Sequence, residues 1–157
     1  MRKLVEKELI SVLIVDDQKE TRSVLSEILG NEGYTVEEAE NGKQALKICQ
    51  KYYLDAALLD IELPDIKGTE LLAELKLIQP KMVNIIITGY PSIENAVKAV
   101  NNKADGYVLK PFDIPLLLET LKKCIEDKKK AYLQMFAELD RSNKSTPIFR
   151  YQNPTSW

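Results

Sequence analysis

Short apolar segments alternate along the chain with longer amphipathic segments. The short segments, which are rich in β-branched residues, predict strands at residues 11–17, 34–39, 55–60, 83–89 and 106–110. The run VLIV in the first segment is typical of a strand that is buried on both faces. The segment at 34–39 is more polar, which favours a position nearer an edge of the sheet.

The longer segments place apolar residues at helical spacing. They predict helices at residues 18–31, 41–52 and 69–78, a fourth after Ser92 and a fifth after Asp113. Strands and helices that alternate in this way indicate one parallel sheet with helices on both faces. In such sheets, ligands bind beyond the carboxyl ends of the strands.

Polar side chains stand at the ends of four of the predicted strands. They are Asp16, Asp17, Asp60, Thr88 and Lys110. Taken alone, each has a simpler interpretation, because Asp17 could cap the next helix, Thr88 could be an ordinary strand-end residue and Lys110 an ordinary surface lysine. An arbitrary domain of this class would rarely place all five on one rim, so their joint occurrence indicates a site.

The chemistry of these groups favours a divalent cation and a phosphoryl group. Three clustered carboxylates repel one another, and Mg²⁺ prefers oxygen ligands of this kind. A carboxylate can also accept a phosphoryl group. Lys110 and Thr88 would then help to neutralise the phosphoryl oxygens. The Gly-rich phosphate loops GxxxxGK[ST] and GxGxxG are missing from the sequence, which disfavours a nucleotide-binding enzyme.

The amino-acid composition excludes several classes of function. The 157 residues suit one domain with some excess, and the absence of histidine removes every Ser-His and Cys-His mechanism. The net charge of −2 argues against direct nucleic-acid binding. No apolar run approaches the ~20 residues that a membrane helix needs, and charges interrupt the N-terminus, so we expect a cytoplasmic protein. Cys49 and Cys124 are expected to be reduced, buried thiols.

Four evenly spread motifs carry a family resemblance. VLIVDD (12–17), ALLDIELPDIKG (57–68), IIITGY (85–90) and GYVLKPFD (106–113) closely resemble the receiver domain of two-component response regulators, over about residues 9–127. The resemblance implies a flavodoxin-like, doubly wound α/β fold. Its five-stranded parallel sheet has the order 2-1-3-4-5, and the last of its five helices is extended.

The resemblance also implies a role for each site residue. Asp60 is the phosphoacceptor, and the Mg²⁺ ligands are Asp16, Asp17, Asp60 and the backbone carbonyl of Glu62. Thr88 and Lys110 complete the phosphorylation site, and the Lys110–Pro111 bond is commonly cis in the family. The implied donor is a phosphohistidine on a sensor histidine kinase or a histidine phosphotransfer protein.

Two positions at which the family varies are candidates for kinetic tuning. Glu62 lies two residues after Asp60, and Tyr90 lies two residues after Thr88. Our hypothesis is that both side chains overlook the phosphoryl site and set how readily water attacks the aspartyl phosphate. The alternative is that both are merely tolerated surface residues.

The resemblance further implies a switch. A phosphoryl group on Asp60 would draw Thr88 toward it, and Tyr107 would turn inward to fill the vacated space. Packing could instead lock Tyr107. The switch would alter the face formed by the fourth helix, the fifth strand and the fifth helix, and a homodimer could form through this face.

The C-terminal excess is open to two interpretations. Apolar residues of the last helix follow 3-4 spacing, interrupted by Lys128: Leu118, Leu121, Ile125, Tyr132, Met135 and Leu139. The stripe can be a coiled-coil seam that mediates self-association, or residues 128–140 can be a solvated extension of the helix. Residues 141–157 are predicted to be irregular. Too few residues follow position 113 for an output domain, so we expect a stand-alone receiver or a fragment.

Two other functions remain as alternatives. A pseudo-receiver scaffold would act without phosphorylation, but the complete set of site residues argues against it. A phosphatase with an aspartyl intermediate would need a general acid or base, for which Glu62 is the only candidate. We therefore expect a receiver that catalyses only its own phosphorylation and dephosphorylation.

Overall fold

The computed structural model describes residues 9–89, 92, 97–98, 101 and 103–145. The chain divides into two compact units, Met1–Ile125 and Glu126–Trp157. No helix in the described parts of the chain is both long enough and apolar enough to cross a membrane.

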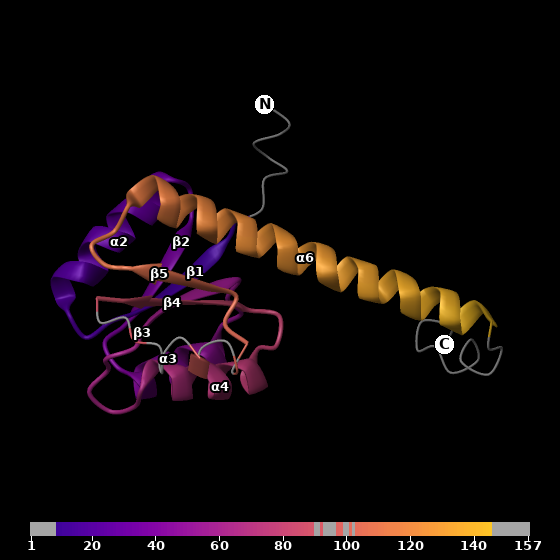
Figure 1. Ribbon diagram of the computed structural model, residues 1–157, viewed down its shortest axis with the longest axis horizontal. Coiled ribbons are helices and arrows are strands. Elements are labelled where there is room, and N and C mark those ends of the chain that lie inside the picture. Colours follow the sequence, from indigo (N-terminus) through magenta and orange to yellow (C-terminus); the bar gives the residue numbers. More distant parts are fainter. Residues whose placement is uncertain (1–8, 90–91, 93–96, 99–100, 102, 146–157) are drawn as a thin grey trace. The chain divides into compact units, whose positions relative to one another are not determined.

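A five-stranded parallel sheet forms the centre of the first unit (Figure 1). Its strands are β1 (Ser11–Val15), β2 (Thr35–Ala39), β3 (Ala56–Asp60), β4 (Val83–Thr88) and β5 (Gly106–Leu109). Their spatial order is β2-β1-β3-β4-β5, which confirms the predicted topology. The polar strand β2 lies at an edge, as its composition predicted, whereas every residue of β3 and β4 is buried.

Helices cover both faces of this sheet. Helix α2 (Lys19–Asn31) and the first turns of α6 (Ile114–Ser145) bury Leu25, Leu29, Leu117 and Leu121 against one face. Helices α3 (Gly42–Lys51) and α4 (Gly68–Ile78) cover the other face. Alternate residues of each strand contribute to the two apolar layers, because successive side chains of a strand point to opposite faces.

The fourth of the five predicted helices lies largely outside the described residues. Val97, Lys98 and Asn101 are helical, and four complete helices are present in the described chain. Two predicted helix starts are confirmed by capping hydrogen bonds. Asn41 accepts a bond from the backbone of Gln44 at 2.8 Å, and Asp113 accepts one from Leu116 at 3.2 Å.

Helix α6 runs further than the sequence pattern predicts. The pattern predicts irregular structure from residue 141, whereas the helix continues to Ser145. The physical reason is that neither proline nor glycine occurs between Leu116 and Thr146, so no residue in this stretch breaks the helix. Residues 146–157 of the predicted irregular tail lie outside the described chain.

Both cysteines are free thiols. Cys49 is buried, as predicted, and burial raises the pKa of its thiol to about 11, which keeps it protonated and unreactive. Cys124 differs from the prediction because it is partly exposed on α6.

Candidate functional site

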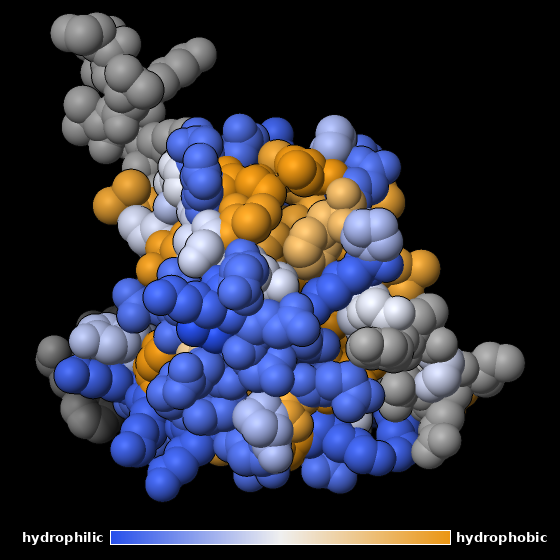
Figure 2. Space-filling model, turned by 90° about the vertical axis from the view of Figure 1, so that its left-hand side faces the viewer, coloured by the Kyte–Doolittle hydropathy of each residue, from blue (hydrophilic) through white to orange (hydrophobic). Residues whose placement is uncertain are grey.

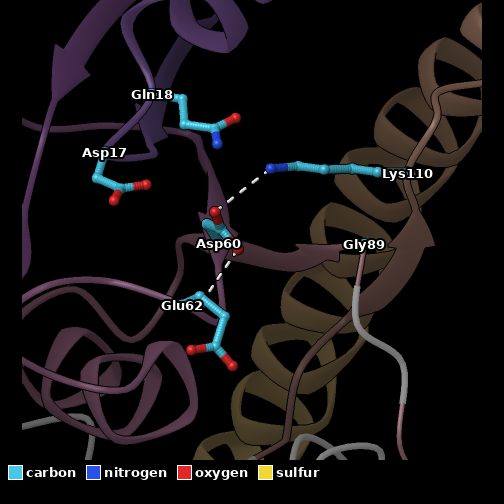
Figure 3. A pocket seen from close by; sticks show the side chains of 6 residues that line it. All are labelled: Asp17, Gln18, Asp60, Glu62, Gly89 and Lys110. Atoms are coloured by element: carbon cyan, nitrogen blue, oxygen red, sulfur yellow. Dashed lines mark hydrogen bonds and ion pairs between the residues drawn. The ribbon is translucent and has the colours of Figure 1, made fainter.

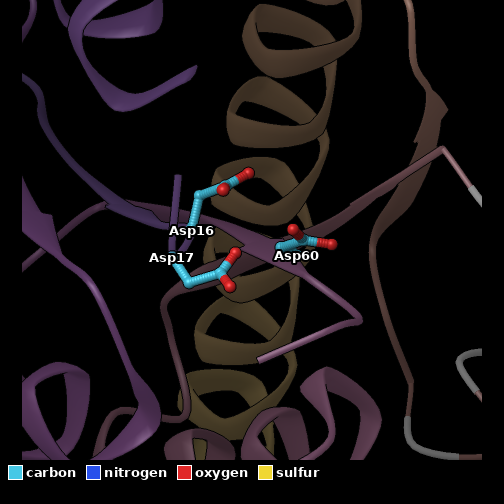
Figure 4. Close-up of side chains that lie close together, drawn as sticks. All are labelled: Asp16, Asp17 and Asp60. Atoms are coloured by element: carbon cyan, nitrogen blue, oxygen red, sulfur yellow. The ribbon is translucent and has the colours of Figure 1, made fainter. Parts of the chain in front are cut away.

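Three carboxylates meet where β1 and β3 end. These strands are neighbours, with Val15 paired to Leu59, so Asp16 follows its strand beside Asp60. The carboxylate oxygens of Asp16, Asp17 and Asp60 lie within 4.8 Å of one another (Figure 4). Asp16 and Asp60 are only 3% and 7% exposed, whereas Asp17 is open to solvent. The predicted acidic cluster is therefore present, with one exposed member.

Lys110 supplies a positive charge to this cluster. It follows β5, and its long side chain reaches past the end of β4 to the acids. Its Nζ donates to Asp16 Oδ2 at 2.8 Å. It also donates to Asp60 Oδ2 at 3.3 Å (Figure 3). The Lys110–Pro111 peptide bond that follows is cis, as the resemblance implied. One lysine offsets only part of the charge of three carboxylates.

Burial and charge shift the pKa values within the cluster. Desolvation and, to a smaller extent, the nearby Asp16 charge raise the pKa of Asp60 to about 6, although the Glu62 N–H and Lys110 lower it in part. Burial alone would lower the pKa of Lys110. The hydrogen bond to Asp16 and the charges of Asp60 and Asp16 outweigh burial and raise it. Lys110 therefore stays charged, and Asp60 is mostly ionised at neutral pH.

The loop after β3 is fixed against its surroundings. The backbone N–H of Glu62 donates to Asp60 Oδ1 at 3.1 Å, and the backbone N–H of Gly68 donates to the Ile61 carbonyl at 2.9 Å. Asp65 accepts bonds from the backbone N–H groups of Gly42 and Lys43, both at 2.9 Å, at the start of α3. The hydrogen bond from Gly42, with those from neighbouring N–H groups, lowers the pKa of Asp65. The bond from the Glu62 N–H orients the Asp60 carboxylate, and the other bonds anchor the loop that follows β3.

The segment after β1 is held from α2. Arg22 Nη1 donates to the backbone carbonyl of Asp16 at 2.7 Å, and its Nε pairs with Glu38 at 3.2 Å. The sequence alone did not identify this arginine, because it stands six residues from Asp16 and is brought back by the first turn of α2.

Asp17 does not cap the first helix, so that alternative is wrong. The N-cap position of α2 belongs to Gln18, whose backbone N–H donates to Asp16 Oδ1 at 2.8 Å. The turn that this bond closes leaves the carboxylate of Asp17 in the acidic cluster.

A pocket opens over Asp60. It is lined by Asp17, Gln18, Asp60, Glu62, Gly89 and Lys110 (Figure 3). Gln18 and Gly89 were not identified from the sequence, although each directly follows a predicted site residue at a strand end. Glu62 is one of the lining residues, and its role in kinetic tuning stays a prediction. Tyr90, the second predicted tuning residue, lies outside the described chain.

Thr88 and Tyr107 lie deeper than the pocket. Thr88 is fully buried at the end of β4, and its backbone carbonyl accepts a bond from the Lys110 N–H at 2.8 Å. It is not among the residues that line the pocket. Tyr107 is partly buried and packs on the apolar layer beneath α3 and α4. Its hydroxyl is buried without a hydrogen-bond partner in the described chain, and desolvation raises its pKa.

The donor set fits a hard divalent cation. Three carboxylates present oxygen atoms close together, and two of them are buried where their repulsion is strong. Lys110 leaves an excess of negative charge for a cation to balance. The exposed Asp17 and the open pocket give solvent access, which suits Mg²⁺ because this ion keeps several water ligands.

Comparisons with known proteins match this fold and site. A family model described as the response regulator receiver domain matches residues 12–122. Sporulation initiation phosphotransferase F of Bacillus subtilis (strain 168) is 38% identical over 112 residues, covering 71% of this chain and 90% of that protein. A CheY-like receiver domain protein from Methanospirillum hungatei JF-1 has a crystal structure with a TM-score of 0.77 and 39% identity, covering 79% of this chain and 99% of that chain.

Longer relatives contain the same region as one part. The transcriptional regulatory protein ZraR of Escherichia coli (strain K12) is 34% identical over 116 residues. The match covers 74% of this chain but 26% of that protein, so the chain spans about a quarter of the length of several curated relatives that it matches.

Proposed function

The chain belongs to the response regulator receiver domain family, and we propose that it is a signalling receiver in which Asp60 accepts a phosphoryl group. The observation that carries the proposal is the position of the Asp60 carboxylate, within 4.8 Å of two further acids and 3.3 Å from the Lys110 ammonium. The proposed receiver spans residues 9–127.

The proposed reaction is a phosphoryl transfer to a carboxylate. An Asp60 oxygen forms a bond to phosphorus while the bond from phosphorus to the donor histidine nitrogen breaks, and that nitrogen keeps the electron pair and later takes a proton from water. Asp16, Asp17, Asp60 and the Glu62 carbonyl would hold Mg²⁺, which when bound neutralises phosphoryl charge. Burial raises the pKa of Asp60 to about 6, which leaves the carboxylate ionised and able to react at neutral pH.

Lys110 and Thr88 have distinct proposed roles. Lys110 already lies against both buried acids, so its ammonium would turn to a phosphoryl oxygen without a large movement. Thr88 is buried and would have to move its hydroxyl toward the phosphoryl group. In this proposal Lys110 binds the phosphoryl group and Thr88 reports it.

Tyr107 is the proposed output of the switch. Its ring packs on the apolar layer while its hydroxyl lacks a hydrogen bond in the described chain. A buried hydroxyl without a partner is costly, so a rearrangement that gives it one would be favourable. Movement of Thr88 would therefore shift the population of Tyr107 positions and change the surface near β5.

Glu62 is the proposed kinetic residue, and Tyr90 is a second candidate. The Glu62 side chain lines the pocket beside Asp60 (Figure 3). A carboxylate on this rim would repel a phosphoryl group and affect the approach of water. The proposed self-dephosphorylation acts only on the phosphorylated Asp60 of the same chain. We therefore do not propose that the chain acts as an enzyme on other molecules.

The proposed donor is a sensor histidine kinase or a histidine phosphotransfer protein in the cytoplasm. A cluster of hydrophobic side chains borders a largely hydrophilic surface on one face of the molecule (Figure 2). Val24 on α2, and Ile114 and Leu116 at the start of α6, are exposed apolar side chains on the two helices that begin shortly after Asp17 and Lys110. An apolar surface beside the phosphorylation site would give a protein donor an area to bind.

Binding of beryllofluoride with Mg²⁺ tests the proposal, because this anion stands in for a phosphoryl group on a carboxylate. Fluorine NMR should show a bound signal for the wild-type chain and none for Asp60→Asn. A pseudo-receiver would give no bound signal with either protein. Steady turnover of phosphate esters would instead favour the phosphatase.

A further inference from the structure

The second unit carries an exposed apolar stripe on α6. Tyr132, Met135, Phe136 and Leu139 follow the spacing i, i+3, i+4, i+7 and so share one face of the helix. Met135, Phe136 and Leu139 are 43%, 51% and 52% exposed. We call these four residues the C-terminal stripe. Apolar side chains gathered on one helical face favour contact with another apolar surface.

Charges flank the stripe asymmetrically. Lys128 and Lys129 lie at its N-terminal end and border the same face, at ~100° per residue around the helix. Glu138 and Asp140 border its C-terminal end. Glu126 and Asp127 lie further round the helix, at about 130° from the centre of the stripe, and Arg141 lies on the opposite side. The stripe therefore has a basic end and an acidic end.

We propose that the C-terminal stripe binds the same stripe of a second copy of this chain in antiparallel orientation. An antiparallel pair centred between Leu133 and Gln134 places Tyr132 opposite Met135 of the other copy. It also places Lys128 opposite Leu139 and beside Asp140 of the other copy, at both ends. Each basic end then meets an acidic end.

A parallel pair would be unfavourable for two reasons. It would stack the Lys128 side chains of the two copies at a core position of the helix pair, where like charges repel and are partly desolvated. It would also bring the acidic ends together. Lys128, at the N-terminal end of the stripe, thus selects against parallel pairing. It is harmless in antiparallel pairing, where the lysine stem can cover Leu139.

The interface is small. Four apolar residues per copy bury less area than a standard stable interface, so we expect dimerisation with a Kd of roughly tens to hundreds of micromolar. The inference uses only residues of the second unit and does not depend on the phosphorylation of Asp60.

Sedimentation of the full chain over a range of concentrations tests the stripe. Met135→Asp should weaken dimerisation at least tenfold, because it places a charge opposite Tyr132 near the centre of the contact. Gln134→Asp is the matched control, since it adds the same group on the opposite face of the same helix, and it should change the Kd less than about threefold. Helix content by circular dichroism verifies that both variants fold.

Charge reversal tests the orientation. Lys128→Glu combined with Lys129→Glu should weaken an antiparallel pair, because four acids then face one another at each end. Mixing this variant with Glu138→Lys, Asp140→Lys should restore a heterodimer. Unchanged self-association of the lysine-reversed variant would mean that basic and acidic ends do not meet, as in a parallel pair, and would overturn the proposal. A full chain that stays monomeric at all concentrations would also overturn the proposal. Residues 146–157 of the same chain would then be the alternative partner of the stripe.

Discussion

Gly68 lies directly against the backbone carbonyl oxygen of Asp60. A Cβ at this position would overlap that oxygen and come within 2.8 Å of the Ile61 Cα. Gly68 is also the first residue of α4, and its backbone N–H donates to Ile61. The start of the helix is thus in contact with the backbone of the proposed phosphoacceptor, and only glycine leaves enough space.

Gly68→Ala should therefore destabilise the fold and disturb the site. Because the neighbouring atoms belong to the backbone, they must shift, and we expect a loss of ~2–4 kcal/mol in the free energy of unfolding. Urea denaturation measures this loss. Gly30→Ala is the control, since a Cβ there meets no atom within 4 Å, and it should stabilise α2 by up to ~1 kcal/mol. Equal stability of the two variants would contradict this account.

The pKa of Asp60 predicts how stability depends on pH. Its value in the folded chain is about 6, above the ordinary value of 3.8, so the folded state binds this proton more tightly than the unfolded state. The ionised Asp60 therefore costs stability above pH 6, and this cost disappears as the pH falls from 6 toward 3.8.

Asp60→Asn should accordingly stabilise the chain at pH 8 by about 1 kcal/mol or more, with no gain near pH 4, when EDTA removes divalent ions. Asp65→Asn is the comparison, because hydrogen bonds from Gly42 and other N–H groups lower the pKa of Asp65. It should cost stability at neutral pH and cost less as the pH falls through the lowered pKa. Thermal unfolding at several pH values measures both trends. A pH-independent effect of Asp60→Asn would refute the assigned pKa.

Removal of one exposed acid should weaken the binding of Mg²⁺. Asp17 is open to solvent, so Asp17→Asn should leave the fold intact and weaken Mg²⁺ binding at least tenfold. Mg²⁺ should raise the melting temperature of the wild-type chain, because a ligand of the folded state stabilises it. The control Glu27→Gln removes an exposed acid on α2 and should keep the full Mg²⁺ response. An unchanged response of Asp17→Asn would place the ion elsewhere.

The lifetime of the aspartyl phosphate tests the proposed tuning residues. Glu62→Asn removes a negative charge from the pocket rim and should change the rate of phosphate loss severalfold, as should Tyr90→Ala. Decay of the phosphorylated protein with time measures the rate. Glu70→Gln, an exposed acid on α4, is the control and should leave the rate unchanged. Lifetimes equal to that of the wild-type chain in both variants would discard the hypothesis.

The sheet and the acidic cluster could both be predicted from the sequence, because both follow from the arrangement of parallel strands. Parallel strands end at one edge, so polar residues that end buried strands must meet there, and Asp16, Asp60 and Lys110 do. The edge position of β2 followed from its polar residues in the same way.

Other features depend on geometry that the sequence does not display. Arg22 reaches the Asp16 carbonyl only because α2 begins at Lys19 and turns the arginine back toward β1. The sequence allowed Asp17 to be a helix cap, and only the hydrogen bond from Gln18 to Asp16 excludes that interpretation. The predicted start of irregular structure at residue 141 is wrong, because a polar segment stays helical where no residue breaks the helix.

Mass measurement of the intact chain after exposure to acetyl phosphate and Mg²⁺ tests the central claim most directly. Acetyl phosphate supplies the phosphoryl group without a protein donor, so the result depends only on the site itself. The account predicts that the wild-type chain gains the mass of one phosphoryl group and that Asp60→Ala gains none. A wild-type chain that stays unmodified, or an Asp60→Ala chain that is modified equally, would contradict it.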